Sequence, residues 1–331
     1  MSRAKHSLVS GIIIVALLGV SLWVWGHRQY IQDWMVVQRY TPTSEIVSIA
    51  DQVGFTDYGR LLFYASEPEV SNADTFNTRC GRKESGTAIL GCYSDGGIYL
   101  YRITNKELDG IEQVTAAHEM LHAAWERMTD QQRTEVAGEL EKAYQRVKTA
   151  KLEERMGYYE RQQPGARANE LHSILGTEST ELGEALEKHY REYFKDRQAI
   201  VAMHKKYEAV FTALEDKAEA IRKELETEAP KINNAIAAHN QAVDALNRTI
   251  IQHNQAASSV DRKSAAAVEA YNAKRAFLQS EQVRLEEEQR AIDKRRVAYN
   301  KRLDEYNALI IRSTTLTNSI DSLKAPANIS E

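Results

Sequence analysis

The C-terminal part of the chain carries an apolar pattern that long, packed helices accommodate best. From about residue 181 to residue 323 the sequence is almost continuously helical in pattern and holds one proline, Pro230. A polar stretch at residues 256–261 divides this part into two arms. Apolar residues step by four and three in the first arm and recur every seven residues in the second: Tyr207, Phe211, Leu214, Ala218, Ile221, Leu225, Ile232, Ile236, Val243, Leu246 and Ile250, then Tyr271, Leu278, Leu285, Ile292, Tyr299 and Tyr306.

This spacing predicts an antiparallel coiled-coil hairpin over residues 196–325, followed by a short tail at residues 326–331. The partner positions of the second seam include polar residues, so one side of the coil is expected to be polar: Arg275, Gln282, Gln289 and Arg296. The hairpin could pair with another coiled coil or with a second copy of the chain.

The N-terminus predicts a membrane anchor over residues 1–28. The sequence from Leu8 to Trp25 is uncharged and just long enough to span a bilayer as a helix. Arg3 and Lys5 precede it, which favours a cytoplasmic N-terminus and an extracytoplasmic body, in the periplasm or at the cell exterior. Trp23, Trp25 and Tyr30 are expected at the far interface. The alternative is a cleaved signal peptide, although no A-x-A site follows the apolar run.

Export changes how the two cysteines are interpreted. Cys80 and Cys92 flank a glycine-containing loop, and in an oxidising compartment such a pair is expected to form a disulfide. The formal net charge of −4 gives no indication of nucleic-acid binding.

The sequence of residues 29–195 predicts a small α+β domain that is mostly helical. Arg60–Ala65, Ile89–Tyr93 and Ile98–Ile103 have the composition of short strands, and the last two are joined by the hairpin signal Ser94-Asp95-Gly96-Gly97. We therefore expect a short antiparallel sheet.

Three helices are predicted after the sheet. The first runs from about Ile111 to Met128, and the capping-box spacing of Asp109 and Glu112 opens it. Thr129 caps the second, which extends to about residue 150, and the third runs from about residue 166 to Gly176.

The first of these helices carries the sequence H-E-x-x-H at His118, Glu119 and His122. Residues four apart lie on the same face of a helix, so both imidazoles can bind one zinc ion. Glu119 can then hold a water molecule and accept its proton. A zinc site with two histidines needs a third protein ligand and an open position for water.

Here the chain resembles the zincin metallopeptidases, and more narrowly the gluzincins, over roughly residues 85–180. In that group a glutamate from a following helix, often preceded by asparagine, completes the zinc site, and Asn169-Glu170 stands in this position. The gluzincin pattern has an aspartate four residues after the ligand, where this chain has Ile174. Glu170 is therefore the first choice for third ligand, with Glu178 and His172 as alternatives that could instead support the ligands.

The resemblance also implies that the strand before the metal helix, Ile98–Ile103, binds substrate along its edge. Tyr158 and Tyr159 precede the third helix and could donate hydrogen bonds to a developing oxyanion, although packing is their ordinary role.

These features predict a membrane-anchored, extracytoplasmic zinc metallopeptidase that hydrolyses peptide bonds of a peptide or protein substrate, with Glu119 as general base. The alternative is a structural or adaptor protein of the cell envelope, in which the coiled coil binds partners and the zinc site is not catalytic. The length of the predicted coil is the feature that favours this alternative.

Overall fold

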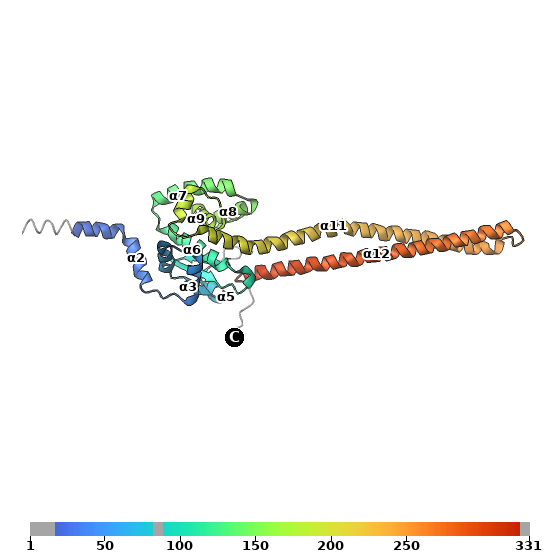
Figure 1. Cartoon of the computed structure of the whole chain (residues 1–331), viewed down its shortest axis with the longest axis horizontal. Coiled ribbons are helices and arrows are strands. Elements are labelled where there is room, and N and C mark those ends of the chain that lie inside the picture. The colour runs from blue at the N-terminus through green and yellow to red at the C-terminus, as the bar shows by residue number, and fades with distance from the viewer. Residues whose placement is uncertain (1–16, 82–88, 325–331) are drawn as a thin grey trace, which may run out of the picture. The chain divides into compact units, whose positions relative to one another are not determined.

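We describe the chain from a computed structural model, which covers residues 17–81 and 89–324 (Figure 1). Its contacts divide the chain into two compact units, one made of Met1–Phe211 with Thr315–Glu331 and the other of Thr212–Thr314. Each unit is described separately below. The chain is mostly helical, as predicted, with one small sheet.

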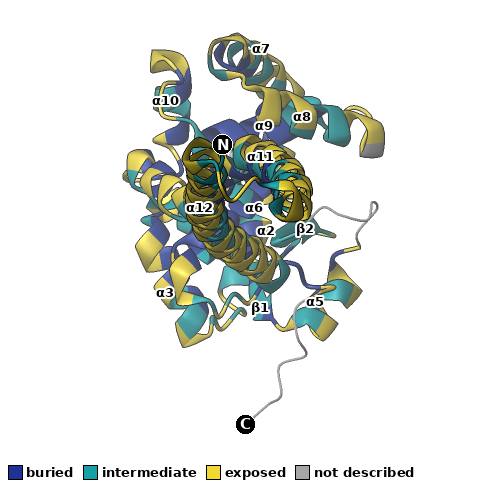
Figure 2. Cartoon of the chain, turned by 90° about the vertical axis from the view of Figure 1, so that its right-hand side faces the viewer, coloured by how far each residue is buried: buried dark blue, intermediate teal, exposed yellow. Residues whose placement is uncertain are grey.

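The first unit contains nine of the labelled α-helices in full, and most of them pack around one large hydrophobic core, while Phe76 of α5 belongs to a smaller cluster with Cys80 and Tyr101. Their bounds are α2 Arg28–Val37, α3 Ser44–Val53, α4 Asp57–Ala65, α5 Ala73–Arg79, α6 Ile111–Arg127, α7 Asp130–Val147, α8 Ala150–Gln162, α9 Arg167–Glu178 and α10 Glu184–Tyr190. Helices α6 and α9 are the most deeply buried of these, as the dark blue ribbon of Figure 2 shows. These two helices carry the residues of interest for function.

The sheet has three strands in the order β1-β3-β2, with bounds β1 Glu69–Ser71, β2 Gly91–Ser94 and β3 Gly97–Tyr101. Strands β2 and β3 form the predicted antiparallel hairpin, and Asp95 and Gly96 turn it with φ of 52° and 81°. Positive φ at both turn positions is typical of a type I′ turn, which Asp-Gly favours. Strand β1 pairs with β3 in parallel, so the sheet is mixed and the prediction of a purely antiparallel sheet was wrong.

The segment Arg60–Ala65 is part of helix α4, and its prediction as a strand was wrong. Thr56 caps this helix, because its side chain accepts a hydrogen bond from the Gly59 amide. Leu62 and Phe63 are fully buried in the core. A short apolar run does not distinguish a strand from a buried helix, and here the cap decides the outcome.

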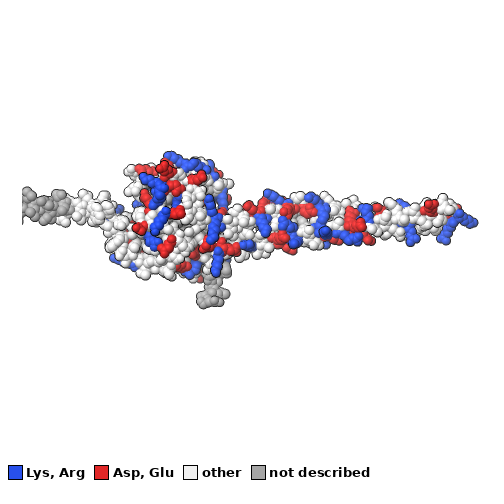
Figure 3. All heavy atoms as spheres, viewed as in Figure 1, with Lys and Arg blue, Asp and Glu red and all other residues white. Residues whose placement is uncertain are grey.

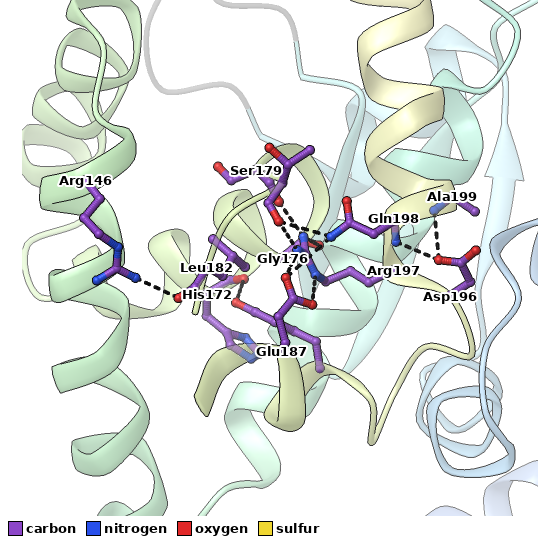
Figure 4. A network of polar contacts seen from close by, with 12 residues as sticks. Arg146, His172, Gly176, Ser179, Leu182, Glu187, Asp196, Arg197, Gln198 and Ala199 are labelled. Atoms are coloured by element: carbon purple, nitrogen blue, oxygen red, sulfur yellow. Dashed lines mark hydrogen bonds and ion pairs between the residues drawn. The ribbon is translucent and has the colours of Figure 1, made fainter. Parts of the chain in front are cut away.

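Helix α9 continues through Gly176, which was predicted to end it. A Cβ atom at this position would lie 2.6 Å from Leu121 Cδ1 and 2.7 Å from Tyr190 Cε1. Gly176 therefore allows α9 to approach α6 closely. The end of α9 is held by the buried Arg197 side chain, which donates to the carbonyl oxygens of Gly176 and Ser179 at 3.3 and 2.6 Å (Figure 4).

The predicted second helix is α7, and the segment after it, which was predicted as a loop, forms the additional helix α8 with Thr149 as its N-cap. Thr129 forms a full capping box with Gln132, as its position predicted for the start of α7. The capping box predicted at Asp109 does not form. Gly110 is the N-cap of α6, and the Glu112 carboxylate accepts a hydrogen bond from the Ile103 amide at 2.7 Å.

The second unit consists of the outer parts of α11 (Arg197–Ala256) and α12 (Ala265–Ser319). The two helices are antiparallel neighbours, because Arg295 pairs with Glu228 and Arg302 pairs with Glu224, each at 2.5 Å. Several predicted seam residues are buried between them: Leu214, Ala218, Ile221, Leu225, Ile232, Leu278, Leu285 and Ile292. Positive and negative side chains alternate along their surface (Figure 3).

The polar seam differs from the prediction. Arg275, Gln282 and Arg296 are exposed, and Gln289 is half-buried. Half-buried charged residues instead follow the heptad apolar residues by three positions, at Glu288, Arg295 and Arg302. These residues face α11, which explains the ion pairs between the helices.

Much of the predicted membrane anchor, residues 1–16, and the tail from residue 325 lie outside the described residues. Residues 17–26 are helical and exposed. Within the described part of the chain, none of the helices combines the length and apolar character required to cross a membrane.

The close contact at Gly176 predicts that Gly176→Ala lowers the free energy of unfolding by about 1–3 kcal/mol, because the new methyl group overpacks α6 against α9. Gly138→Ala in α7 is the matched control. Nothing lies within 4 Å of a Cβ atom there, so alanine should raise stability by about 0.5–1 kcal/mol through its helix propensity. Urea denaturation of both variants measures the difference, and equal effects would contradict the packing role of Gly176.

Candidate metal centre

Helix α6 presents the H-E-x-x-H residues inside the core of the first unit. Four alanines surround the motif, Ala116, Ala117, Ala123 and Ala124, and all four are buried. Their small side chains allow α9 and the sheet to pack close to the helix backbone. His122 and Glu119 are buried, with exposed fractions of 9% and 5%, whereas His118 is half-buried.

Helix α9 adds Glu170 to the two imidazoles. One potential ligand atom from each of His118, His122 and Glu170 lies within 4.8 Å of the others, and this group could hold a metal ion. It is the only such group of histidine, cysteine and acidic residues among the described residues. Glu170 was the first choice for third ligand, and the structure places it beside the histidines.

The separation of the two imidazole nitrogens is close to that in a tetrahedral metal site, and the distance to the carboxylate is longer. The Nε2 atoms of His118 and His122 are 3.1 Å apart, and His122 Nε2 lies 3.9 Å from Glu170 Oε2. Two ligand atoms at about 2.0–2.1 Å from one tetrahedral zinc ion are separated by about 3.3 Å. Glu170 Oε2 is buried and has no hydrogen-bond partner, which is costly for a carboxylate unless a cation binds it.

Two residues of α9 orient His122. Its Nδ1 atom lies 2.9 Å from Asn169 Oδ1 and 3.3 Å from Ser173 Oγ. Donation of the Nδ1 proton to the asparagine oxygen leaves the Nε2 lone pair free for a metal ion. The sequence pattern included Asn169 beside the ligand but gave it no role, and it did not identify Ser173. Both lie within one helical turn of Glu170. Their closeness in sequence to the candidate ligand could have identified them as its neighbours.

The electrostatics of the group favour a cation. Burial lowers the pKa of His118 and His122, so both rings are neutral at neutral pH and available as ligands. Burial raises the pKa of Glu170 to about 7, against the opposing effects of the Arg155 charge and a hydrogen bond from Tyr159. A bound cation would relieve the cost of ionising this carboxylate.

Glu119 lies between the metal-binding group and the sheet. Burial, followed by the nearby charge of Glu170, raises the pKa of Glu119 well above its usual range, and a hydrogen bond from the Tyr93 amide opposes this increase. The strand approaches closely because residue 91 is glycine. A Cβ atom there would lie 2.6 Å from Thr115 Cγ2 and 3.0 Å from Glu119 Oε1.

The two alternative ligands lie outside the three-residue group. His172 is fully buried, and its Nε2 atom is 2.9 Å from His189 Nε2. Glu178 forms a bidentate ion pair with Arg155, with distances of 3.0 and 2.5 Å. Arg155 was not identified from the sequence, yet its charge affects both His118 and Glu170.

Both candidate tyrosines lie in helix α8, which was predicted as a loop. Tyr159 is part of the site, because it hydrogen-bonds Glu170 and because the charges of Glu170 and Glu119 raise its pKa, in addition to the larger effect of burial. Tyr158 packs edge-on against Tyr159, with ring centroids 5.6 Å apart.

Cys80 and Cys92 form the predicted disulfide. The bond joins the end of α5 to β2, the strand whose amide contacts Glu119. The disulfide fixes the strand from the side opposite to α6.

Comparison of the chain with family models, with curated proteins and with solved structures finds no match. The assignment of function therefore depends on the site itself.

Asn169→Ala should lower the affinity for a divalent metal ion by about 10–100-fold, because His122 loses the partner that fixes its tautomer and ring orientation. Gln163→Ala, at an exposed position just before α9, is the control and should leave affinity unchanged. Competition with a chelating dye measures both. An unchanged affinity in Asn169→Ala would show that the contact does not support the ligand.

The raised pKa of Glu170 predicts how the stability of the metal-free protein depends on pH. The unfolded chain ionises this residue near its usual value of 4.5, whereas the folded protein does so near 7. Ionisation therefore favours the unfolded state as the pH rises from about 4.5 to 7, and up to about 3 kcal/mol of stability is lost over that range. Glu170→Gln should reduce this loss in chelator-treated protein, as followed by urea denaturation at several pH values. An equal pH dependence in both proteins would contradict the burial argument.

Proposed function

We propose that the chain is a zinc-dependent peptidase of the zincin type, with His118, His122 and Glu170 as ligands. The observation that supports this best is that three ligand atoms lie within 4.8 Å of one another and that a further buried carboxylate, Glu119, lies on the same helix as the two histidines. A structural zinc site would use four protein ligands, whereas this group offers three and leaves a position for water.

Zinc, when bound, would lower the pKa of a coordinated water and polarise the carbonyl group of the scissile bond. Glu119 would accept the proton of the attacking water and deliver it to the leaving amine. Its burial favours this role, because the raised pKa makes the carboxylate a stronger base than an exposed glutamate. Tyr159 is placed to donate a hydrogen bond to an oxyanion, since it already lies against Glu170.

The substrate-binding strand differs from the one expected. Ile98–Ile103 contains β3, the central strand, which pairs with β2 over residues 97–100 and with β1 over residues 99–101, so neither of its edges is free there. Among the described residues, β2 is the edge strand that lies against Glu119. We therefore assign the extended substrate to the outer edge of Gly91–Ser94, where main-chain hydrogen bonds would hold it beside the base.

The location of the enzyme follows from the sequence. The uncharged run from Leu8 to Trp25 would anchor the chain in the cell membrane, with its body in the periplasm or at the cell exterior. The disulfide between Cys80 and Cys92 is consistent with an oxidising compartment.

Glu119→Gln tests the catalytic assignment. The amide has nearly the same size and cannot accept the proton, so hydrolysis should fall by at least about 100-fold while zinc stays bound. The measurement is the cleavage of a mixed peptide library by the full chain, followed by mass spectrometry, together with the zinc content of each protein. Glu135→Gln, at an exposed position of α7, is the control and should keep full activity.

The same measurement separates the peptidase from an envelope adaptor protein. An adaptor would bind zinc and cleave no peptide in the parent protein. Full activity in Glu119→Gln would instead overturn the assignment of the base.

A further inference from the structure

Helix α2, which follows the apolar N-terminal run, has two different faces. Asp33 is buried, with 5% of its surface exposed, and Val36 and Val37 are half-buried on the same side. Tyr30, Trp34 and Met35 point outwards and are 54%, 51% and 41% exposed. Large exposed aromatic side chains on one helix face indicate a surface that is covered by something other than water.

A membrane surface is the partner that the sequence around this face favours. Tyr30 and Trp34 are four residues apart and share one face of α2, and Trp23 lies in the helical segment of residues 17–26 just before it, within the apolar run. Tryptophan and tyrosine prefer the boundary between lipid tails and headgroups. The described N-terminal residues are almost free of charged side chains in Figure 3, in contrast to the rest of the visible surface.

The buried face of α2 is fixed to the metal-binding helix. Arg127, at the end of α6, donates two hydrogen bonds to Asp33, from Nε to Oδ2 at 2.9 Å and from Nη2 to Oδ1 at 2.8 Å. Both side chains are less than a tenth exposed. A bidentate arginine–carboxylate pair of this kind defines orientation as well as distance.

The same arginine contacts the strand beside the base. Arg127 Nη1 lies 3.3 Å from the Tyr93 hydroxyl, which also bonds Glu126. The Tyr93 amide donates to Glu119. Two routes, along α6 and through β2, therefore connect α2 to the metal-binding group.

The distance between α2 and the metal-binding group is short. About 14 Å of helix separates Arg127 from His118, and a helix lying on a surface is about 10–12 Å thick. The metal-binding group is thus no more than about 25 Å from the outer face of α2.

We propose that α2 lies in the membrane interface with Tyr30, Trp34 and Met35 among the lipid headgroups, and that the enzyme cleaves peptide segments presented close to the bilayer. The inference rests on the proposed peptidase function, to which it adds the substrate class. Membrane-proximal stretches of anchored proteins, and peptides attached to lipid, fit this class. Segments raised well above the bilayer lie out of reach of the site.

The experiment uses the full chain in phosphatidylcholine and phosphatidylglycerol vesicles. A randomised peptide library is displayed on a lipid anchor, either directly or on a rigid helical spacer about 60 Å long. The directly anchored library should be cleaved at least about tenfold faster. Equal cleavage of the two displays would overturn the inference and leave the peptidase function intact.

Two variants test the geometry. Y30E/W34E changes only exposed side chains, so it should fold normally, and it should reduce the preference for the directly anchored library by lifting α2 from the interface. Phe277→Glu, which changes another exposed aromatic residue, should keep the full preference. A preference that survives in Y30E/W34E would contradict the role of this face.

A readout independent of activity is the quenching of tryptophan fluorescence by lipids brominated near the headgroup. W23F/W25F retains Trp34 and Trp125, and it should be quenched more than W23F/W25F/W34F, which retains Trp125 alone. Equal quenching would overturn the placement of α2. Quenching of Trp34 without cleavage of either library would support the placement but overturn both the peptidase function and the substrate class.

Discussion

The contact between α6 and α9 determines whether the candidate site exists. Each helix supplies part of the metal-binding group, His118 and His122 from one and Glu170 from the other. Their separation is set by Gly176, where even a methyl group would meet Leu121 and Tyr190 at less than 3 Å. This packing buries a carboxylate oxygen without a hydrogen-bond partner, which is unfavourable in the metal-free protein and favourable with a cation bound. Folding thus prepares the site at a cost in stability.

The surrounding residues form a continuous set of contacts with this group. Asn169 and Ser173 orient one ligand, and Tyr159 hydrogen-bonds another. The disulfide fixes β2 beside Glu119, and the Asp33–Arg127 pair fixes α2 to the same helix. In our account, the ligands, the base, the substrate edge and the membrane-facing helix therefore keep constant relative positions within the first unit.

Structural features that depend on local chemistry were predicted correctly from the sequence. The H-E-x-x-H spacing predicted two histidines on one face of a helix, and α6 has them there. The Asp-Gly turn forms the predicted hairpin, and the two cysteines form the predicted disulfide. The long heptad repeat also identified two long helices with a turn between them. These features depend on neighbours close in sequence or on strict periodicity, so little tertiary information was needed.

Structural features that depend on tertiary packing were not predicted correctly from the sequence. Arg60–Ala65 has the composition of a strand but is a buried helix, and Gly176 has the appearance of a helix end but serves close packing. The parallel pairing of β1 with β3 joins residues far apart in sequence, so no local sequence pattern could predict it. The sequence put Glu170 first but left Glu178 open as an alternative, and setting Glu178 aside required the position of Arg155, which holds Glu178 in an ion pair. The most direct measurement of the central claim is the zinc content of the purified full chain by elemental analysis after dialysis, compared with His118→Ala and with His253→Ala in the long helices as control. We expect one zinc ion per chain in the parent and in the control and almost none in His118→Ala, whereas a metal-free parent, or equal zinc in all three proteins, would contradict the account.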